Sequence, residues 1–214
     1  MMRKIERENT GLLHAGQDLV VAGYAGLAGT VKLAETKKEE LSRWFSDEYM
    51  EEIAGCSRYL LREAEGDGMR AAENLAEDAP LCAVSPDFWR ACGATEWETA
   101  GEGGILTAIW NLTGAYETGV EFYLRQIPIR QETVEVCERL ELNPYRLYSQ
   151  GCVLLTADNG GQLVRTLAEK HIPAQVIGRV NKGIAREMIV QEGRGFLERP
   201  QPDEILKVIP GFFD

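Results

Sequence analysis

Apolar positions along the chain follow two spacings, one typical of strands and one typical of helices. Segments such as DLVVA and GCVLLTA are short and almost continuously apolar, which predicts buried strands. Other stretches place apolar residues every three or four positions, which predicts helices. Strands are expected at 18–22, 94–99, 120–124, 151–157, 174–180 and 184–190.

Helices are expected in the stretches between these strands. Ser85 followed by Pro86 is typical of a helix start, and Asp158 or Asn159 would cap a later helix. The expected helices are 31–45, 47–64, 69–77, 85–92, 105–117, 130–140, 160–170 and 203–208. Because strands and helices interleave with crossovers of varied length, we expect an α+β fold. It would be an α/β sandwich, a mixed sheet with helices packed against it, and not a Rossmann domain.

The length of 214 residues suits one large domain or two small ones. We expect a polar leader at 1–15 and a single domain over 16–214, because no repeat or clear linker divides the chain. The stretch 37–92 is rich in expected helices. It is either a subdomain or one helical layer of the main domain.

The net charge of the chain limits the classes of partner that it is expected to bind. Lys and Arg number 23 and Asp and Glu number 34, so the formal net charge is 23 − 34 = −11. Nucleic acid and anionic membranes need clustered cations, so neither is an expected partner. The first residues are polar, and no window reaches the roughly 20 apolar residues of a membrane span. We therefore expect a cytoplasmic protein.

Cysteine and histidine spacing does not predict a metal site. The five cysteines are scattered without a CxxC pair, and the two histidines, His14 and His171, lie far apart. We expect the cysteines to be reduced and buried as small apolar side chains. They are Cys56, Cys82, Cys92, Cys137 and Cys152.

Two glycine-rich turns, each between a strand and a helix, are candidate ligand sites. The first carries Gly23, Gly26, Gly29 and Thr30. Glycine lets the backbone come close to a ligand, and free amides at a helix start attract anions. The spacing matches neither the dinucleotide-binding nor the Walker pattern, so a tight turn with close helix packing is the alternative interpretation.

The second turn is Gly101-Glu102-Gly103-Gly104, where the same amide argument applies. Glu102 repels a free phosphate, whereas a metal-bridged phosphate or a ligand hydroxyl would suit it. A plain turn with an acidic cap residue is the alternative. On the preceding strand, Glu96 and Glu98 share one face, either as a carboxylate pair or as solvated side chains.

An ordered series of motifs adds a family resemblance. The GEGG turn precedes a helix, IPI ends the next strand, LNPY and SQG precede an apolar strand, and VIGRV forms another. In this order the segment 101–180 resembles the C-terminal domain of the AIR synthase superfamily, and the strand and turn from Asp18 extend the resemblance to about 16–190. That superfamily includes aminoimidazole ribonucleotide synthase, HypE, selenophosphate synthetase and thiamine-monophosphate kinase. The likeness is greatest to HypE-like and AIR synthase-related members.

The resemblance also implies what this chain lacks. Family enzymes carry a preceding domain whose acidic residues hold magnesium and ATP phosphates, and only about fifteen residues precede the matching strand here. We therefore expect no ATP or magnesium to bind to this chain alone. HypE-like relatives tend to have Asp-Pro-Thr-Arg-Gly-Gly at the central loop and a cysteine in the C-terminal tail. This chain has Thr99 and Glu102 before Gly103 and Gly104, and it ends in IPGFFD.

Three functional hypotheses follow from the resemblance. The first is a stand-alone domain that binds a phosphate-bearing or small polar ligand without catalysing a reaction. The second is half of an ATP-dependent enzyme, completed by a separate N-terminal ATP-binding partner. The third is an oligomeric scaffold, since family members are commonly homodimers. The candidate ligand-binding residues are Gly23, Gly26, Gly29, Thr30, Thr99, Gly101, Glu102, Gly103 and Gly104.

Overall fold

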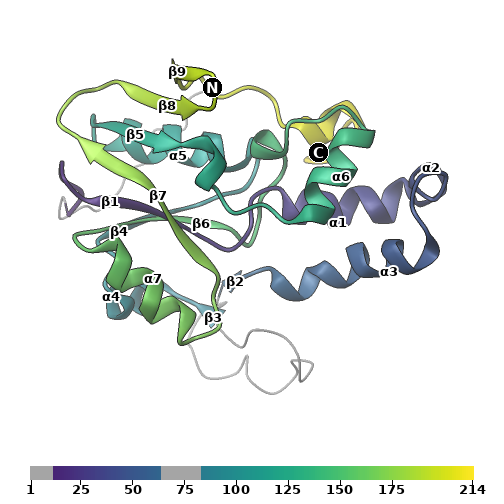
Figure 1. The fold of residues 1–214 in the computed structure, drawn as a ribbon, viewed down its shortest axis with the longest axis horizontal. Coiled ribbons are helices and arrows are strands. Elements are labelled where there is room, and N and C mark those ends of the chain that lie inside the picture. Colours follow the sequence, from purple (N-terminus) through teal and green to yellow (C-terminus); the bar gives the residue numbers. More distant parts are fainter. Residues whose placement is uncertain (1–11, 64–82) are drawn as a thin grey trace.

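A mixed sheet organises the part of the chain that the computed structural model describes, residues 12–63 and 83–214 (Figure 1). Its strands are β1 Asp18–Ala22, β4 Glu96–Thr99, β5 Gly119–Tyr123, β6 Val153–Ala157, β7 Ala174–Asn181, β8 Arg186–Val190 and β9 Gly193–Phe196. The strand order is β4-β6-β1-β7-β5-β8-β9. Neighbouring strands are antiparallel except β5 and β8, which are parallel. A separate parallel pair joins β2 Arg62–Glu63 to β3 Ala83–Val84.

Helices cover both faces of this sheet, which confirms the expected α+β sandwich. The α-helices are α1 Leu27–Thr36, α2 Lys38–Leu41, α3 Asp47–Gly55, α4 Pro86–Cys92, α5 Gly104–Ala115, α6 Gln131–Arg139 and α7 Gly160–Ala168. Single 3-10 turns are η1 Cys56–Tyr59, η2 Leu124–Gln126, η3 Pro144–Arg146 and η4 Glu204–Lys207. Ser85 caps α4 by accepting from the Phe88 amide, as expected, and Asn159 caps α7.

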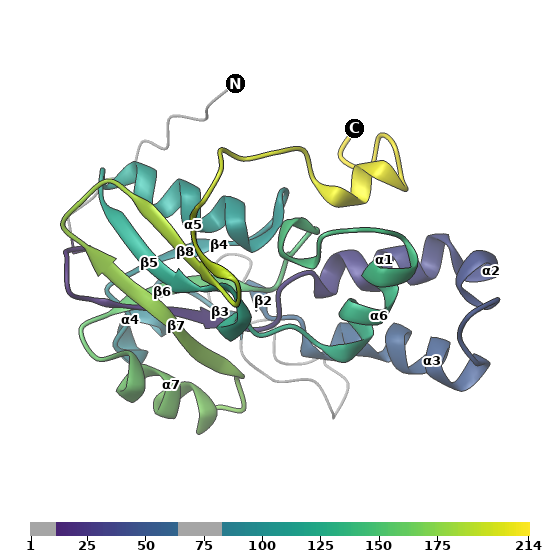
Figure 2. The same cartoon turned by 45° about the horizontal axis from the view of Figure 1, so that its top comes forward.

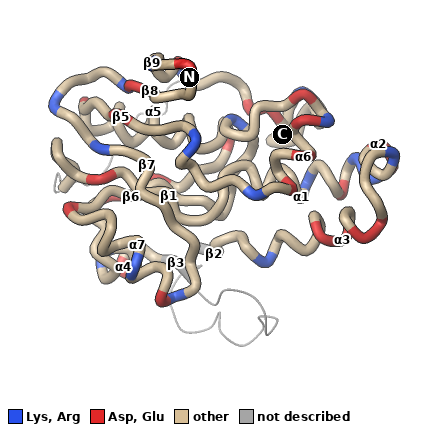
Figure 3. Tube along the Cα trace, in the orientation of Figure 1, with Lys and Arg blue, Asp and Glu red and all other residues tan. Residues whose placement is uncertain are grey.

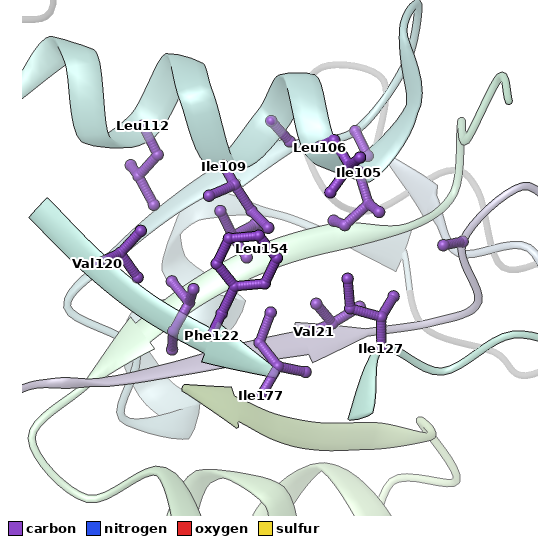
Figure 4. Close-up of a cluster of buried hydrophobic side chains, with 14 of the residues drawn as sticks. Val21, Ile105, Leu106, Ile109, Leu112, Val120, Phe122, Ile127, Leu154 and Ile177 are labelled. Atoms are coloured by element: carbon purple, nitrogen blue, oxygen red, sulfur yellow. The ribbon is translucent and has the colours of Figure 1, made fainter. Parts of the chain in front are cut away.

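The central strands β1 and β6 are buried on both faces, which explains their continuous apolar sequence. Leu19 and Val21 point into one apolar cluster beneath α5, and Val20 points into a second cluster beneath α4 and α7. Phe122 of β5 lies in the middle of the first cluster, against Ile109 of α5 (Figure 4). Burial on both faces fixes the register of these strands, because a slip by one residue would exchange the two faces.

A third cluster lies at the helical end of the molecule. Ile53 of α3 packs with Leu33 of α1, Val136 of α6, Leu147 and Ile205, and all are buried. Figure 2 shows α1, α3 and α6 side by side at this end, away from the outer strands. Helices α2 and α3 of the stretch 37–92 therefore share a core with α1 and α6 from the rest of the domain.

Several elements differ from the sequence prediction in their bounds or their type. The expected helix 31–45 is wrong at both ends, because Gly26 in the left-handed conformation starts α1 at Leu27 and the helix ends at Thr36. The expected helix 47–64 stops at Gly55, and the chain then forms η1 and β2. Strand β9 was not expected, because its sequence GRGF is poor in strand-forming residues. The expected helix 69–77 lies outside the described residues.

The sheet face away from α5 is polar along the outer strands. Val120 and Phe122 point inward from β5, whereas Glu121 and Tyr123 occupy the alternate positions. Arg194 of β9 pairs with Glu121 on this face, at 3.3 Å. Acidic and basic positions are interspersed over most elements (Figure 3). Within the described ranges, no helix is long and apolar enough to cross a bilayer.

Candidate functional site

The first glycine turn is folded into the body of the domain. The Gly23 amide donates to the Pro173 carbonyl at 2.8 Å, and the Gly29 amide donates to the Tyr148 carbonyl at 2.9 Å. The Gly26 amide donates to the hydroxyl of Ser149 at 2.8 Å. Thr30 is fully buried, and its hydroxyl donates to the Gly26 carbonyl. These backbone donors are therefore already satisfied by protein acceptors.

Close backbone approach explains why glycine occupies this turn. Gly26 has a φ of +72°, and a Cβ there would lie 2.8 Å from the Pro144 carbonyl oxygen. A Cβ on Gly29 would lie 2.5 Å from Cγ of Leu147. The contacts made by α1 and the segment 144–149 thus account for the spacing of these glycines, and they favour the packing interpretation of the turn.

The second glycine turn reaches the surface. Thr99 and Glu102 are exposed, while Gly103 and Gly104 are buried at the start of α5. Gly103 and Gly104 have φ values of +79° and +68°, which disfavour any other residue. A Cβ on Gly104 would also collide with the backbone of η3. In contrast, a Cβ on Gly101 would meet open space.

A carboxylate from the C-terminal segment occupies the start of α5. One oxygen of Asp203 accepts from the Gly103 amide at 2.6 Å, and the other accepts from the Tyr148 and Ile205 amides at 3.1 and 2.9 Å. Asp203 is 1% exposed. The amide argument therefore holds for this turn, but the anion present comes from the chain itself, a hundred residues further on.

Burial and charge both act on this carboxylate. Burial raises the pKa of Asp203 above its ordinary value, and the negative charge of Glu102 adds to the rise. The three backbone amides lower the pKa and so oppose part of that effect. The turn therefore combines two acidic side chains, Glu102 at the surface and Asp203 buried beneath it.

Ser149 connects the two turns. Its hydroxyl accepts from the Gly26 amide, and its own amide donates to the Gly101 carbonyl at 3.2 Å. Ser149 is fully buried between the turns. The structure thus brings both sequence-predicted turns to one segment, 143–151, and only the second remains open to solvent.

Sequence reasoning did not identify Asp203 or Ser149 as part of this site. Ser149 stood within the SQG motif, and Asp203 stood at the start of a short expected helix. Neither local pattern indicates that the two residues contact the glycine turns. Trp97 packs against the second apolar cluster, so Glu96 and Glu98 take the alternate positions on β4, as expected.

Metal-ligating side chains, which are those of His, Cys, Asp and Glu, do not gather in groups of three within the part of the chain that the structure describes. At the second turn, the Asp203 oxygens are already engaged by amides.

Comparison with solved structures gives the fold a precedent. Escherichia coli HypE, a hydrogenase maturation protein, matches with a TM-score of 0.64 and 18% identity over 92% of this chain. A HypE solved in complex with ATP matches with a TM-score of 0.61 and 17% identity over 92% of this chain. Thiamine-monophosphate kinase from Stenotrophomonas maltophilia K279a matches with a TM-score of 0.53 and 16% identity over 79% of this chain. At these identities the likeness shows the fold alone. This chain spans 54%, 55% and 49% of those proteins, about half of each.

Comparison with protein-family models shows which family the chain belongs to. No curated protein matches the chain. The family model described as "AIR synthase related protein, C-terminal domain" matches residues 15–191, which include both glycine turns, Ser149 and all strands of the main sheet except β9. The chain therefore belongs to the AIR synthase related family and carries its C-terminal domain.

Proposed function

We propose that this domain binds a phosphate-bearing or small polar ligand at its exposed turn, residues 99–104, and does not catalyse a reaction by itself. The contrast between the two glycine turns carries the proposal. The Gly103 and Gly104 amides of the second turn also donate to protein acceptors, but the first turn is buried, whereas the second presents Thr99 and Glu102 to solvent beside the start of α5. The Ser149 amide donates to the Gly101 carbonyl and so holds this second turn in place, which lowers the entropy cost of binding.

Calorimetry with a charge-reversal variant tests this proposal. ATP, carbamoyl phosphate and aminoimidazole precursors are titrated into the chain, with and without magnesium. Glu102→Arg is expected to bind a phosphate ligand about tenfold more tightly than the wild type, because a repulsive charge becomes an attractive one. Glu39→Arg makes the same charge change on exposed α2 and serves as the control. Equal affinities of both variants would leave residues 101–104 as a plain turn.

The second candidate is half of an ATP-dependent enzyme, completed by a separate N-terminal ATP-binding partner. It is favoured by the likeness of the fold to HypE proteins, one of which is solved in complex with ATP. The acidic turn also suits a phosphate whose charge is balanced by magnesium, and a partner would have to supply the remaining ligands. In this arrangement the turn positions the substrate while the partner holds the nucleotide.

Reconstitution separates the two candidates. ATP hydrolysis that appears only when the chain is mixed with an N-terminal ATP-binding partner would support the enzyme half. Failure of the two proteins to co-purify would exclude the enzyme half.

A scaffold role as a homodimer is tested separately by light scattering, where a monomer alone would exclude it. Cys56, Cys137 and Cys152 are buried free thiols, which supports a cytoplasmic setting.

A further inference from the structure

The last strand of the main sheet, β9, has one free side. It pairs with β8 on its inner side, where Gly195 lies opposite Met188 and Phe196 lies opposite Glu187. Figure 1 shows β9 at the rim of the sheet, and within the described residues no strand pairs with its outer side. The free side of a strand presents amide and carbonyl groups that can pair with a strand of another chain.

The backbone groups of Arg194 and Phe196 point to this free side. The Leu197 amide donates to the Arg186 carbonyl at 2.8 Å. By the alternation of an antiparallel ladder, every second residue before Leu197 is also bonded to β8. The residues in between, Arg194 and Phe196, therefore hold their amides and carbonyls away from the sheet.

The side chains of the same two residues share the sheet face away from α5. Phe196 is 67% exposed. Arg194 pairs with Glu187 at 2.8 Å and with Glu121 at 3.3 Å, so its charge is already balanced within the chain. Unbalanced charges are one of the devices that keep sheet edges apart, and β9 lacks one. On the other face of the strand, a Cβ on Gly195 would meet open space.

We propose that β9 pairs antiparallel with β9 of a second copy of this chain, about a twofold axis at Gly195. Arg194 of each copy then lies directly opposite Phe196 of the other, and each of these pairs exchanges both backbone hydrogen bonds. The guanidinium lies beside the partner ring, where a cation–π contact forms. This interface goes beyond the ligand site proposed at residues 99–104, and neither depends on the other.

The order of side chains along β9 favours a second copy over an unrelated strand. Arginine and phenylalanine lie one residue to either side of Gly195, so the strand complements itself when it is reversed. A twofold axis at Arg194 would instead set two arginines opposite each other, which is unfavourable. The acidic residues that flank β9 do not extend the pairing, because Glu192 lies in the turn from β8 and Glu198 pairs with Arg146.

A cysteine at the proposed axis tests the register. Residue 195 would lie opposite its own copy in a pair without backbone bonds, with Cα atoms about 4.5 Å apart, a separation that a disulfide spans. With oxidised glutathione as the oxidant, Gly195→Cys is expected to form a linked dimer at least about tenfold faster than Ile184→Cys, because pairing raises the local thiol concentration. Ile184 is 78% exposed between β7 and β8 and serves as the control. Non-reducing electrophoresis measures both rates, and equal rates overturn the proposal.

Sedimentation velocity tests the interface without a crosslink. A strand this short buries little surface, so we expect a weak dimer of the wild type that forms as the concentration rises over about 10–500 µM. Phe196→Pro removes an outward amide without breaking a bond to β8, and it is expected to raise the dimer dissociation constant at least about tenfold. Ile184→Ala removes an exposed apolar side chain away from β9 and should leave the dissociation constant unchanged.

Each result decides for or against the pairing of β9. A wild type that stays monomeric over the whole range overturns the proposal, and so does a Phe196→Pro protein that dimerises as well as the wild type. An equal loss in Ile184→Ala would show that exposed apolar side chains in general, and not β9, drive association. If Phe196→Pro unfolds, the rates of Gly195→Cys and Ile184→Cys decide alone.

Discussion

Cysteine chemistry in this chain is governed by burial. Burial raises the pKa of Cys56 to about 11, with the charge of Glu132 adding to the effect, and raises the pKa values of Cys137 and Cys152 to about 12. A thiol with such a pKa is almost entirely protonated at neutral pH, and the thiolate is the nucleophile. Cys137 and Cys152 therefore serve as apolar core, as the sequence predicted for all five cysteines, whereas the buried Cys56 thiol also donates to Glu132; Cys82 lies outside the described residues.

We expect Cys56, Cys92, Cys137 and Cys152 to resist alkylation in the native protein. The measurement is iodoacetamide labelling at about pH 8, mapped by mass spectrometry, with protein unfolded in guanidinium as the control. All four described cysteines are buried, so labelling should require unfolding. Rapid native labelling at Cys152 would contradict its burial against the apolar cluster beneath α5.

The raised pKa of Asp203 makes a pH-dependent contribution to stability. Between the unfolded value of about 3.9 and the higher folded value, the folded chain binds more protons than the unfolded chain. The contribution is therefore most favourable below about pH 4 and falls as the pH rises through this window. We expect the free energy of unfolding of the wild type, relative to that of Asp203→Asn, to fall in the same direction. Urea titrations across this pH range measure it; a difference that rises with pH would contradict it.

At the scale of elements, the conformation of the second turn should depend on one glycine far more than on another. Gly104→Ala forces a side chain into a left-handed backbone and against η3, so we expect a loss of at least about 2 kcal/mol and a Tm lower by about 4–8 °C. Gly101→Ala meets open space and should change stability by less than about 0.5 kcal/mol. Thermal denaturation followed by circular dichroism compares the two. Equal Tm values for the variants would mean that η3 yields to the added methyl group.

Local pattern predicted the elements whose signals are local. The strand predicted from the continuous apolar sequence of β6 and the Ser85 cap predicted for α4 are both confirmed, because each depends on neighbouring residues. Strand β9 could not be predicted, since GRGF becomes a strand only through pairing with β8. Asp203 could not be placed at Gly103 for the same reason: the contact spans a hundred positions and is created by the fold.

At the scale of the whole molecule, packing decides whether the helix-rich stretch 37–92 is a subdomain. Ile53 of α3 is fully buried and shares its cluster with Val136, Leu147 and Ile205 from later parts of the chain. Elsewhere, α1 follows β1 directly, and β1 lies between the other two clusters. A residue from the helical end should therefore stabilise the same folded unit as a residue under the sheet.

We expect the chain to unfold in one common transition. Ile53→Ala and Leu155→Ala should each lower its free energy of unfolding by about 2–5 kcal/mol, because both create a cavity in a buried cluster. Val134→Ala on α6, where the side chain is 41% exposed, is the control and should cost much less. Calorimetric scans of the three variants give the measurement. If Ile53→Ala split the scan into two peaks and shifted only one, the helices of 37–92 would form a separate subdomain. A single shifted peak follows if the clusters unfold together, because then no part of the sheet survives loss of the helical end.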